Sequence, residues 1–297
     1  MSGYNTETVN IQFLNQSFLD KVDQGMTKEA GVAMSAFVRQ KLREDGFTRK
    51  ILPPKPITAA ELDRQLTEEP TVIVEKEPDS IAANMPFLGR SEIRYFKGAR
   101  YPVTFQKISS ADFRKSKFEL ATYRTDIRTV LQENSIKDLQ AAEDLNFYNN
   151  VIAMATANSN VHTISGGFTK ANLLNGVKKL LEKKLPVGCI LMTQSMYTDL
   201  LSFPATEVGS PAASELMRGQ ATLDTFFGYK IITTNKSDIL PTNQAIVFAP
   251  ENYLGQFYTL QDATVFLKVE KDMLEWSTYE SLGVGIGNVN GAAVLNF

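Results

Sequence analysis

Few side chains in this sequence are suited to covalent chemistry, and they are scattered along the chain. The only histidine, His162, lies in a polar, glycine-containing turn. Three serines were considered as nucleophiles, and none lies in a recognisable nucleophile elbow: Ser165, Ser195 and Ser202. The only cysteine, Cys189, lies inside an apolar run, where a free thiol is commonly buried and unreactive. We therefore expect a loop histidine, a buried cysteine and no catalytic residues.

Adjacent acidic residues occur as two pairs, Glu68 with Glu69 and Glu143 with Asp144. Neighbouring residues of a helix point to different faces, so neither pair directs two carboxylates at one substrate. We expect all four side chains to be solvated charges.

A glycine-rich string, GVGIGNVNG, occupies residues 283–291. It departs from the G-x-G-x-x-G fingerprint, and no helix is predicted after it whose N-terminus would bind a phosphate. We expect these glycines to let strands approach one another closely, not to bind a nucleotide.

The composition is that of a folded globular protein and argues against several ligand classes. Of 297 residues, 43% are hydrophobic and 22% charged, and the net charge of -2 provides no overall basic surface for nucleic acid. One cysteine excludes an internal disulfide, and one histidine excludes a multi-histidine metal site. Residues 1–14 lack a signal-peptide pattern, and no apolar run is long enough to span a bilayer. We expect no cofactor, no metal and no membrane partner.

The longest predicted element, about which the others are organised, is a helix from Ser135 to Ala157. Ser135 and Asp138 form a variant of the capping box, which places a carboxylate at the positive end of the helix dipole. Apolar residues recur at three- and four-residue spacing and predict one buried face: Ile136, Leu139, Ala142, Leu145, Tyr148 and Ile152. No proline or glycine interrupts the segment, so we expect a straight helix of roughly 30 Å.

The chain before this helix is predicted to contain an arm, two helices and a hairpin. Residues 1–26 are polar, a helix spans Thr27–Asp45, and Thr58 begins a short helix after three prolines. β-branched and alternating residues then predict four strands: Thr71–Val74, Ile93–Phe96, Tyr101–Ile108 and Phe118–Tyr123. This hairpin has too few large apolar residues for a core of its own, so we expect it to lie on another chain.

Four basic residues are placed at the tip of the hairpin: Arg90, Arg94, Lys97 and Arg100. Guanidinium groups favour bidentate pairing with carboxylates, so we expect these residues to contact acidic side chains of a neighbouring subunit. The alternative is a solvated basic loop.

The chain after the long helix is predicted to form a compact α/β lobe from about residue 160 to 260. Thr169 caps a helix that ends at Lys184, and a short helix covers Ser195–Phe203. Apolar runs predict three buried strands: Val187–Thr193, Tyr229–Thr233 and Ala245–Ala249. The tail predicts a half-covered antiparallel sheet, with the long helix as its cover: Leu254–Leu260, Thr264–Val269, Met273–Leu282 and Ala292–Phe297.

In this order of elements the chain resembles the major capsid proteins of tailed double-stranded DNA bacteriophages, the family with the Hong Kong 97 type fold. The resemblance rests on the arm, the hairpin and the long helix, followed by TKANLLNGVKKLLEKKLPVGCILMTQSMYTDLL, FFGYKIITTN, QAIVFAP and WSTYESLGVGIGNVNGAAVLNF. It implies an α+β fold with these parts: an N-terminal arm and helices at 1–69, an extended E-loop hairpin at 70–117, a peripheral domain at 118–160 and 261–297 with the spine helix at 135–157, and an axial domain at 161–260.

The resemblance implies a structural protein that is not an enzyme. Identical copies would form the hexamers and pentamers of an icosahedral shell around double-stranded DNA, in a virion assembled in the bacterial host cytoplasm. Portal and scaffolding proteins would be its partners, and the packaged DNA would lie close to it without specific contacts. Only about 70 residues precede the hairpin, so a separate scaffolding protein is expected in place of a cleaved scaffolding segment. An arm and a hairpin that cannot bury themselves suit a ring-closing interface, because each subunit lends segments to its neighbours.

Two other functions remain open. An encapsulin-like nanocompartment shell would enclose a cargo protein and need no scaffold. A soluble α/β enzyme centred on residues 160 to 260 would need a pocket of converging titratable groups, and the sequence contains no such constellation. A few capsid proteins of this family join a hairpin lysine to an asparagine by an isopeptide bond, and Lys97 with Asn288 or Asn290 would be the corresponding pair here.

Overall fold

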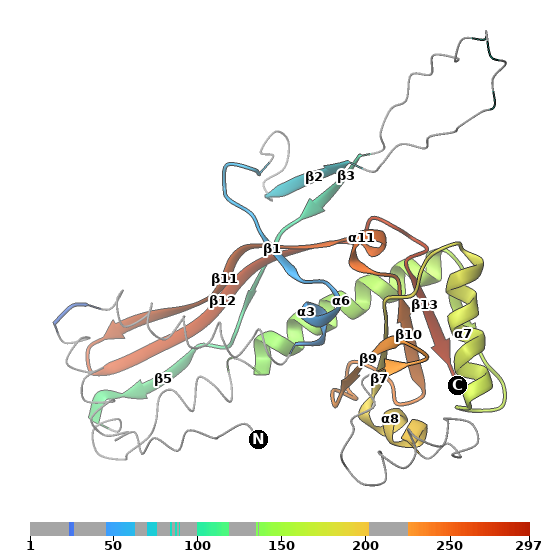
Figure 1. Cartoon of the computed structure of the whole chain (residues 1–297). Coiled ribbons are helices and arrows are strands. Elements are labelled where there is room, and N and C mark those ends of the chain that lie inside the picture. The colour runs from blue at the N-terminus through green and yellow to red at the C-terminus, as the bar shows by residue number, and fades with distance from the viewer. Residues whose placement is uncertain are drawn as a thin grey trace.

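The computed structural model describes residues 24–26, 46–62, 70–75, 84, 87, 89, 100–118, 135, 137–201 and 225–297. The helices in this part of the chain are α3 (Phe47–Ile51), α6 (Lys137–Ala157), α7 (Lys170–Glu182), α8 (Gln194–Leu201) and α11 (Glu251–Leu254). The strands are β1 (Pro54–Pro56), β2 (Thr71–Glu75), β3 (Arg100–Thr104), β4 (Gln106–Ser109), β5 (Phe113–Ser116), β6 (Val161–Thr163), β7 (Cys189–Thr193), β8 (Thr225–Phe226), β9 (Tyr229–Thr234), β10 (Gln244–Phe248), β11 (Gln256–Glu270), β12 (Met273–Gly285) and β13 (Ala292–Asn296). They form two larger sheets and one two-stranded sheet (Figure 1).

The largest sheet has six strands in the order β6-β13-β10-β7-β9-β8 and forms the centre of a compact lobe. Successive side chains of a strand point to opposite faces, so β7 contributes to two cores. Cys189 and Leu191 pack with α3 and α6, whereas Ile190 and Met192 pack with α7 and α8. The lobe is therefore a three-layer α/β/α arrangement, and the continuous apolar run predicted as a buried strand is confirmed as β7.

Helix α7 begins where the sequence predicts. Thr169 has an extended backbone, and its Oγ1 accepts a hydrogen bond from the N–H of Asn172 at 3.3 Å. The helix buries one face against the six-stranded sheet through Leu173, Val177 and Leu180. This side of the lobe thus follows directly from the N-cap and the apolar spacing.

The second sheet is built around a long antiparallel ribbon of β11 and β12, which extends away from the lobe (Figure 1). Strand β11 covers both segments that were predicted as separate strands, and its pairing with β12 changes register around Gln261. Strand β12 confirms the predicted alternation, because Leu274, Trp276 and Thr278 are all buried. Strands β4 and β5 pair with β12 on its other side.

Strand β1 forms one edge of the ribbon sheet. It runs parallel to β11, with Pro54 opposite Phe257 and Pro56 opposite Thr259. Proline has no backbone N–H and is found in sheets mainly on edge strands, which agrees with the place of β1 at the end of the strand order.

The segment predicted as one strand, Tyr101–Ile108, forms two strands that belong to different sheets. Strand β3 pairs with β2, whereas β4 pairs with β12. The chain changes sheets at Phe105, whose N–H donates to the carbonyl of Pro70 at 3.0 Å and whose ring is buried. The strand predicted to begin at Phe118 is wrong at its start, because β5 ends at Ser116 and Phe118 lies in the helical turn that follows.

Helix α6 confirms the predicted long helix, but two details of that prediction are wrong. The Oγ of Ser135 is buried and has no hydrogen-bond partner among the described residues, so Ser135 does not cap the helix. The buried face is also rotated, because Leu145 is 42% exposed while Glu143 and Asp144 are buried. The apolar residues of this face follow a four-residue spacing: Leu139, Phe147, Val151 and Ala155.

The last strand belongs to a different sheet from the one predicted. Strand β13 pairs with β10 and β6, so it completes the sheet of the lobe and is separate from the ribbon. The short helix predicted to begin at Thr58 is wrong over the described residues, because residues 59–60 form a turn and residues 58–62 contain no helix. Thr58 donates to Glu61 from its N–H and its hydroxyl at 2.8 and 3.0 Å. Several predictions lie outside the described residues: the arm apart from residues 24–26, the helix Thr27–Asp45 and the strand Ile93–Phe96.

None of the described helices is both long enough and apolar enough to cross a membrane.

Candidate assembly site

The sheet formed by β2 and β3 stands on the ribbon and lies within the predicted hairpin of residues 70–117 (Figure 1). The end of that predicted range is part of the ribbon sheet, because β4 and β5 pair with β12. Val103 and Phe105 are buried with Tyr258 of β11 in a small core of their own. On β2, Val72 packs against this core, whereas the next residue, Ile73, is 45% exposed. The hairpin therefore has one face seated on the ribbon and one apolar side chain that faces away from this core.

Glycines of the string 283–291 allow this close seating. A Cβ added at Gly285 would lie 2.5 Å from a methyl group of Val103, and one added at Gly287 would overlap the hydroxyl of Tyr101. Strand β12 ends at Gly285, and residues 286–291 contain no helix. The prediction that these glycines let strands approach closely is confirmed.

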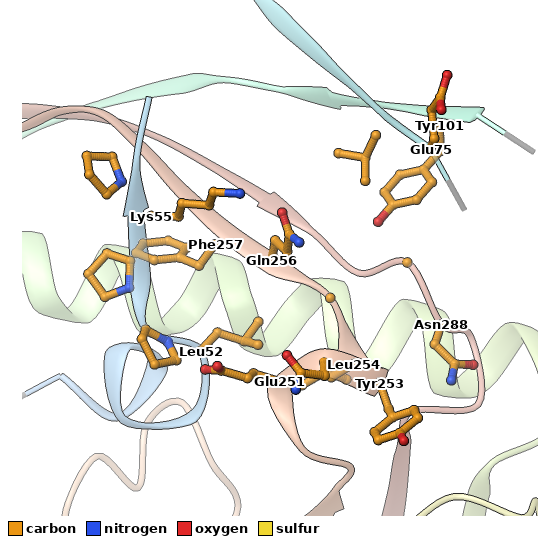
Figure 2. Close-up of a pocket in the computed structure, with 17 residues that line it drawn as sticks. Leu52, Lys55, Glu75, Tyr101, Glu251, Tyr253, Leu254, Gln256, Phe257 and Asn288 are labelled. Carbon is orange, nitrogen blue, oxygen red and sulfur yellow. The ribbon is translucent and has the colours of Figure 1, made fainter. Parts of the chain in front are cut away.

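A pocket of about 710 Å³ lies between the hairpin, β1 and α11 (Figure 2). Glu75 and Tyr101 line it from the hairpin, Lys55 from β1, and Glu251 and Tyr253 from α11. The described residues that line it include no serine, histidine or cysteine. Its two carboxylates come from separate elements, Glu75 from the hairpin and Glu251 from α11.

Of the four basic residues predicted at the hairpin tip, Arg100 lies within the described residues and the others lie outside them: Arg90, Arg94 and Lys97. Arg100 begins β3, and its Nη2 lies 2.6 Å from Oε1 of Glu75 on β2. Both side chains are about two-thirds exposed, at 66% and 65%, so solvent screens their attraction. The contact with a neighbouring subunit stays a prediction, and Arg100 already has one carboxylate partner within its own chain.

The two asparagines considered for a cross-link lie near the pocket and are hydrogen-bonded. The Oδ1 of Asn288 accepts from the N–H of Asn290 at 3.1 Å, and the Oδ1 of Asn290 accepts from Asn160 at 3.4 Å. Lys97 lies outside the described residues, so the cross-link also stays a prediction.

A buried ionic cluster, which the sequence did not predict, ties α3 and α6 to the ribbon. Arg49 of α3 donates from Nε to Glu143 of α6 at 3.0 Å. Its Nη1 lies 3.3 Å from Asp262 of β11, and its Nη2 lies 3.1 Å from Glu280 of β12. We call these four residues the Arg49 cluster.

A second set of contacts, beside the Arg49 cluster, holds Asp144. Thr48 donates to its Oδ1 from the backbone N–H at 3.0 Å and from the hydroxyl at 2.7 Å, and Lys236 lies 2.6 Å from its Oδ2. The expectation that Glu143 and Asp144 are solvated is therefore wrong, since they are 2% and 0% exposed. Each carboxylate is buried because a cation and hydrogen-bond donors from distant segments compensate it.

Burial governs the electrostatics of the Arg49 cluster. Burial raises the pKa of Glu143 to about 6, although the charge of Arg49 acts in the opposite direction. Burial, followed by the charge of Glu143, raises the pKa of Glu280 to about 8. One guanidinium thus faces three carboxylates, which is more negative charge than it can neutralise.

Of the residues suited to catalysis, His162, Cys189 and Ser195 lie on different elements, β6, β7 and α8. His162 lies on the edge strand β6 and not in a turn, and partial burial, followed by the charge of Lys179, lowers its pKa. Ser195 lies in α8, and the carbonyl of Ser165 accepts a hydrogen bond from Asn172. The prediction that Cys189 is buried is confirmed, and burial raises the pKa of its thiol to about 12. Three candidates lie outside the described residues: Ser202, Glu68 and Glu69.

Within the described ranges, no group of three or more histidine, cysteine, aspartate or glutamate side chains is placed to hold a metal ion.

Comparison with known proteins gives matches at the level of structure. No protein-family model and no curated protein sequence matches the chain. The chain is similar to a solved structure from Microbacterium phage Oxtober96, with a TM-score of 0.60 and 11% identity over 85% of this chain and 91% of that chain. It is similar to the capsid structure of Cyanophage P-SCSP1u, with a TM-score of 0.54 and 12% identity over 83% and 86%. It is also similar to the crystal structure of a virus-like particle from Pyrococcus furiosus, with a TM-score of 0.54 and 16% identity over 89% and 98%.

These likenesses confirm the resemblance expected from the order of elements. The chain shares its mixed α/β fold with these phage and capsid structures. At these sequence identities the likeness concerns the fold.

Proposed function

We propose that the chain is the major capsid subunit of a tailed phage, and that its copies form the hexamers and pentamers of an icosahedral shell around double-stranded DNA. The observation that carries this proposal is the likeness to phage capsid structures over more than four-fifths of the chain. The seating of β2 and β3 supports it. One face of this two-stranded sheet packs on the ribbon in a small core, and a two-stranded projection of this kind is expected to gain stability from a further surface such as a neighbouring subunit.

The fold suggests the role of each part of the subunit. We assign them as follows: residues 1–69 as the N-terminal arm and helices, 70–117 as the E-loop, 118–160 and 261–297 as the peripheral domain with α6 as its spine helix, and 161–260 as the axial domain. The sheets cross this division at several elements. Strand β13 pairs with β10 of the axial lobe, β4 and β5 of 70–117 pair with β12, and β11 continues across the boundary at 260.

The partners in this function are further copies of the chain, a scaffolding protein and a portal protein. Contact with packaged DNA would be non-specific, since a net charge of -2 gives no overall attraction to phosphate. The subunit would act without enzymatic chemistry in a virion assembled in the host cytoplasm.

The basic residues of the hairpin offer a test of the subunit contact: Arg90, Arg94, Lys97 and Arg100. We propose that they pair with carboxylates of the neighbouring subunit. Reversing the charge at Arg94 and Arg100 together should reduce the yield of closed particles, more strongly at low salt than at high salt. An unchanged yield at both salt concentrations would refute the pairing.

Electron microscopy after size-exclusion chromatography tests the function itself, on the chain expressed alone and with a scaffolding protein. Closed shells, or rings of five and six copies, are the expected result. A stable small oligomer under every condition would refute it and direct attention to the α/β lobe as an enzyme.

The proposed cross-link of Lys97 with Asn288 or Asn290 has its own test. On a denaturing gel, a monomer-sized band from assembled particles would refute it.

The second candidate is an encapsulin-like nanocompartment, which is favoured by the likeness to the virus-like particle from Pyrococcus furiosus. The contents of purified particles distinguish the two. A phage capsid should require a scaffold and package DNA, whereas a nanocompartment should close unaided around one cargo protein.

A further inference from the structure

Glu280 is a buried carboxylate that lacks a full set of hydrogen-bond donors. Its side chain, on β12, is completely buried, and Oε2 accepts from Nη2 of Arg49 at 3.1 Å. Its Oε1 is also buried and has no hydrogen-bond partner in the described part of the chain. A buried, unpaired carboxylate oxygen is costly, so this position favours the neutral acid with its proton on Oε1.

The charges that face Glu280 come from three packed elements. Arg49 reaches it from α3, Glu143 from α6 and Asp262 from β11. With every carboxylate ionised, one positive charge would face three negative charges in a buried position. A proton on Glu280 removes one of these negative charges.

Two other charged side chains of the surrounding elements are engaged elsewhere. Asp144, also on α6, is held by Lys236 at 2.6 Å. Lys107, on the neighbouring strand β4, lies 4.1 Å from the ring of Tyr279. Adjacent residues of a strand point to opposite faces, so Lys107 lies on the face of β12 away from Glu280.

We propose that Glu280 binds a proton at the junction of α6 with the β11–β12 ribbon, and that release of this proton loosens the junction. With Glu280 neutral, Arg49 is left to pair with Glu143 and Asp262. With Glu280 ionised, the Arg49 cluster holds an additional buried negative charge, and Oε1 of Glu280 has no hydrogen-bond partner in the described part of the chain. The inference concerns the folded chain itself, so it holds whether or not copies of the chain form a shell.

The direction of the pKa shift agrees with this proposal and gives the sign of the pH effect. Burial raises the pKa of Glu280 from 4.5 to about 8, so between these values the folded chain holds a proton that the unfolded chain has released. Stability therefore falls as the pH rises through this range. The pKa of Glu143 is about 6, so a window from pH 6.5 to 8.5 reports mainly on Glu280.

The test is urea unfolding of the full-length, unassembled chain across this window, followed by the fluorescence of Trp276, the only tryptophan. In the wild type, the equilibrium constant for unfolding should rise at least tenfold from pH 6.5 to 8.5. In Glu280→Gln, whose amide mimics the neutral acid, this rise should be absent. The control is Glu275→Gln, the same change on β12 at a residue that pairs with Arg114, and it should keep the wild-type rise.

Two results would overturn the proposal: an unchanged pH dependence in Glu280→Gln, or a variant more than tenfold easier to unfold than the wild type at pH 6.5. If Glu280→Gln does not fold, infrared spectroscopy of the wild type with isotope-labelled glutamate answers the same question. A protonated carboxyl band that is present at pH 6.5 and lost by pH 9 supports the proposal. Its absence at pH 6.5 overturns it.

Discussion

Replacing Arg49 with methionine removes the single cation of the Arg49 cluster while keeping an unbranched side chain. In the native chain the guanidinium lies 3.0 to 3.3 Å from three carboxylates, and the side chain is 3% exposed. Removing one partner of a buried ion pair costs about 3–5 kcal/mol, because the remaining charge is left uncompensated. We expect this loss in the free energy of unfolding near pH 8. The loss should be smaller near pH 5.5, where Glu143 and Glu280 take up protons.

Urea unfolding at both pH values, followed by the fluorescence of Trp276, measures this effect. With a urea dependence of about 3 kcal/mol per M, the midpoint should fall by about 1 M or more at pH 8. The matched control is Arg114→Met, because Arg114 pairs with Glu275 at 2.9 Å but is exposed, and its midpoint should stay near that of the wild type. A wild-type midpoint for Arg49→Met at pH 8, or a loss of equal size at both pH values, would refute the reasoning.

Three further predictions follow from single contacts. Gly285→Ala places a Cβ 2.5 Å from Val103, so it should destabilise the chain by about 1–3 kcal/mol. Limited proteolysis should then show faster cleavage between β2 and β3 than in the wild type. Thr169→Ala removes the N-cap of α7 and should lower the free energy of unfolding by about 1 kcal/mol, whereas Thr169→Ser should not. Cys189 should resist alkylation in the folded chain at pH 8 and react once urea unfolds it, because burial raises its pKa to about 12; rapid labelling of the folded chain would contradict this.

The elements that the sequence predicts well are those whose signals are local. The cap at Thr169 lies three residues from its partner, and the apolar run that ends at Thr193 and the alternation from Leu274 to Thr278 each lie within one strand. The resemblance to the capsid fold rests on the order and the lengths of these elements, and both can be read from local patterns.

The candidate site was harder to predict, because its contacts join distant segments. Arg49 lies 94 residues from Glu143 and 231 residues from Glu280, so no spacing within a helix reveals that these charges meet. One signal was available. Glu143 lies four residues from both Leu139 and Phe147, which places it on the buried face of α6. The rule that a charged residue is exposed fails where a distant cation compensates a buried acid.

The sequence of a strand likewise does not indicate which other strand it pairs with. Strand β13 is apolar and short, as predicted, and this pattern fits either sheet. Its pairing with β10 depends on how the chain returns to the lobe after β12, which local periodicity does not encode.

The two prolines of β1 limit how copies of this chain can join. A sheet edge rich in free N–H groups can recruit an extended segment of any neighbour, and at the crowding of a shell this leads to open-ended aggregation. A strand approaching β1 would meet three residues of which two, Pro54 and Pro56, have no N–H to donate. Addition of a strand to the ribbon sheet is therefore disfavoured at this edge. In the proposed shell, copies of the chain would meet there through side-chain surfaces, whose geometry allows a ring to close.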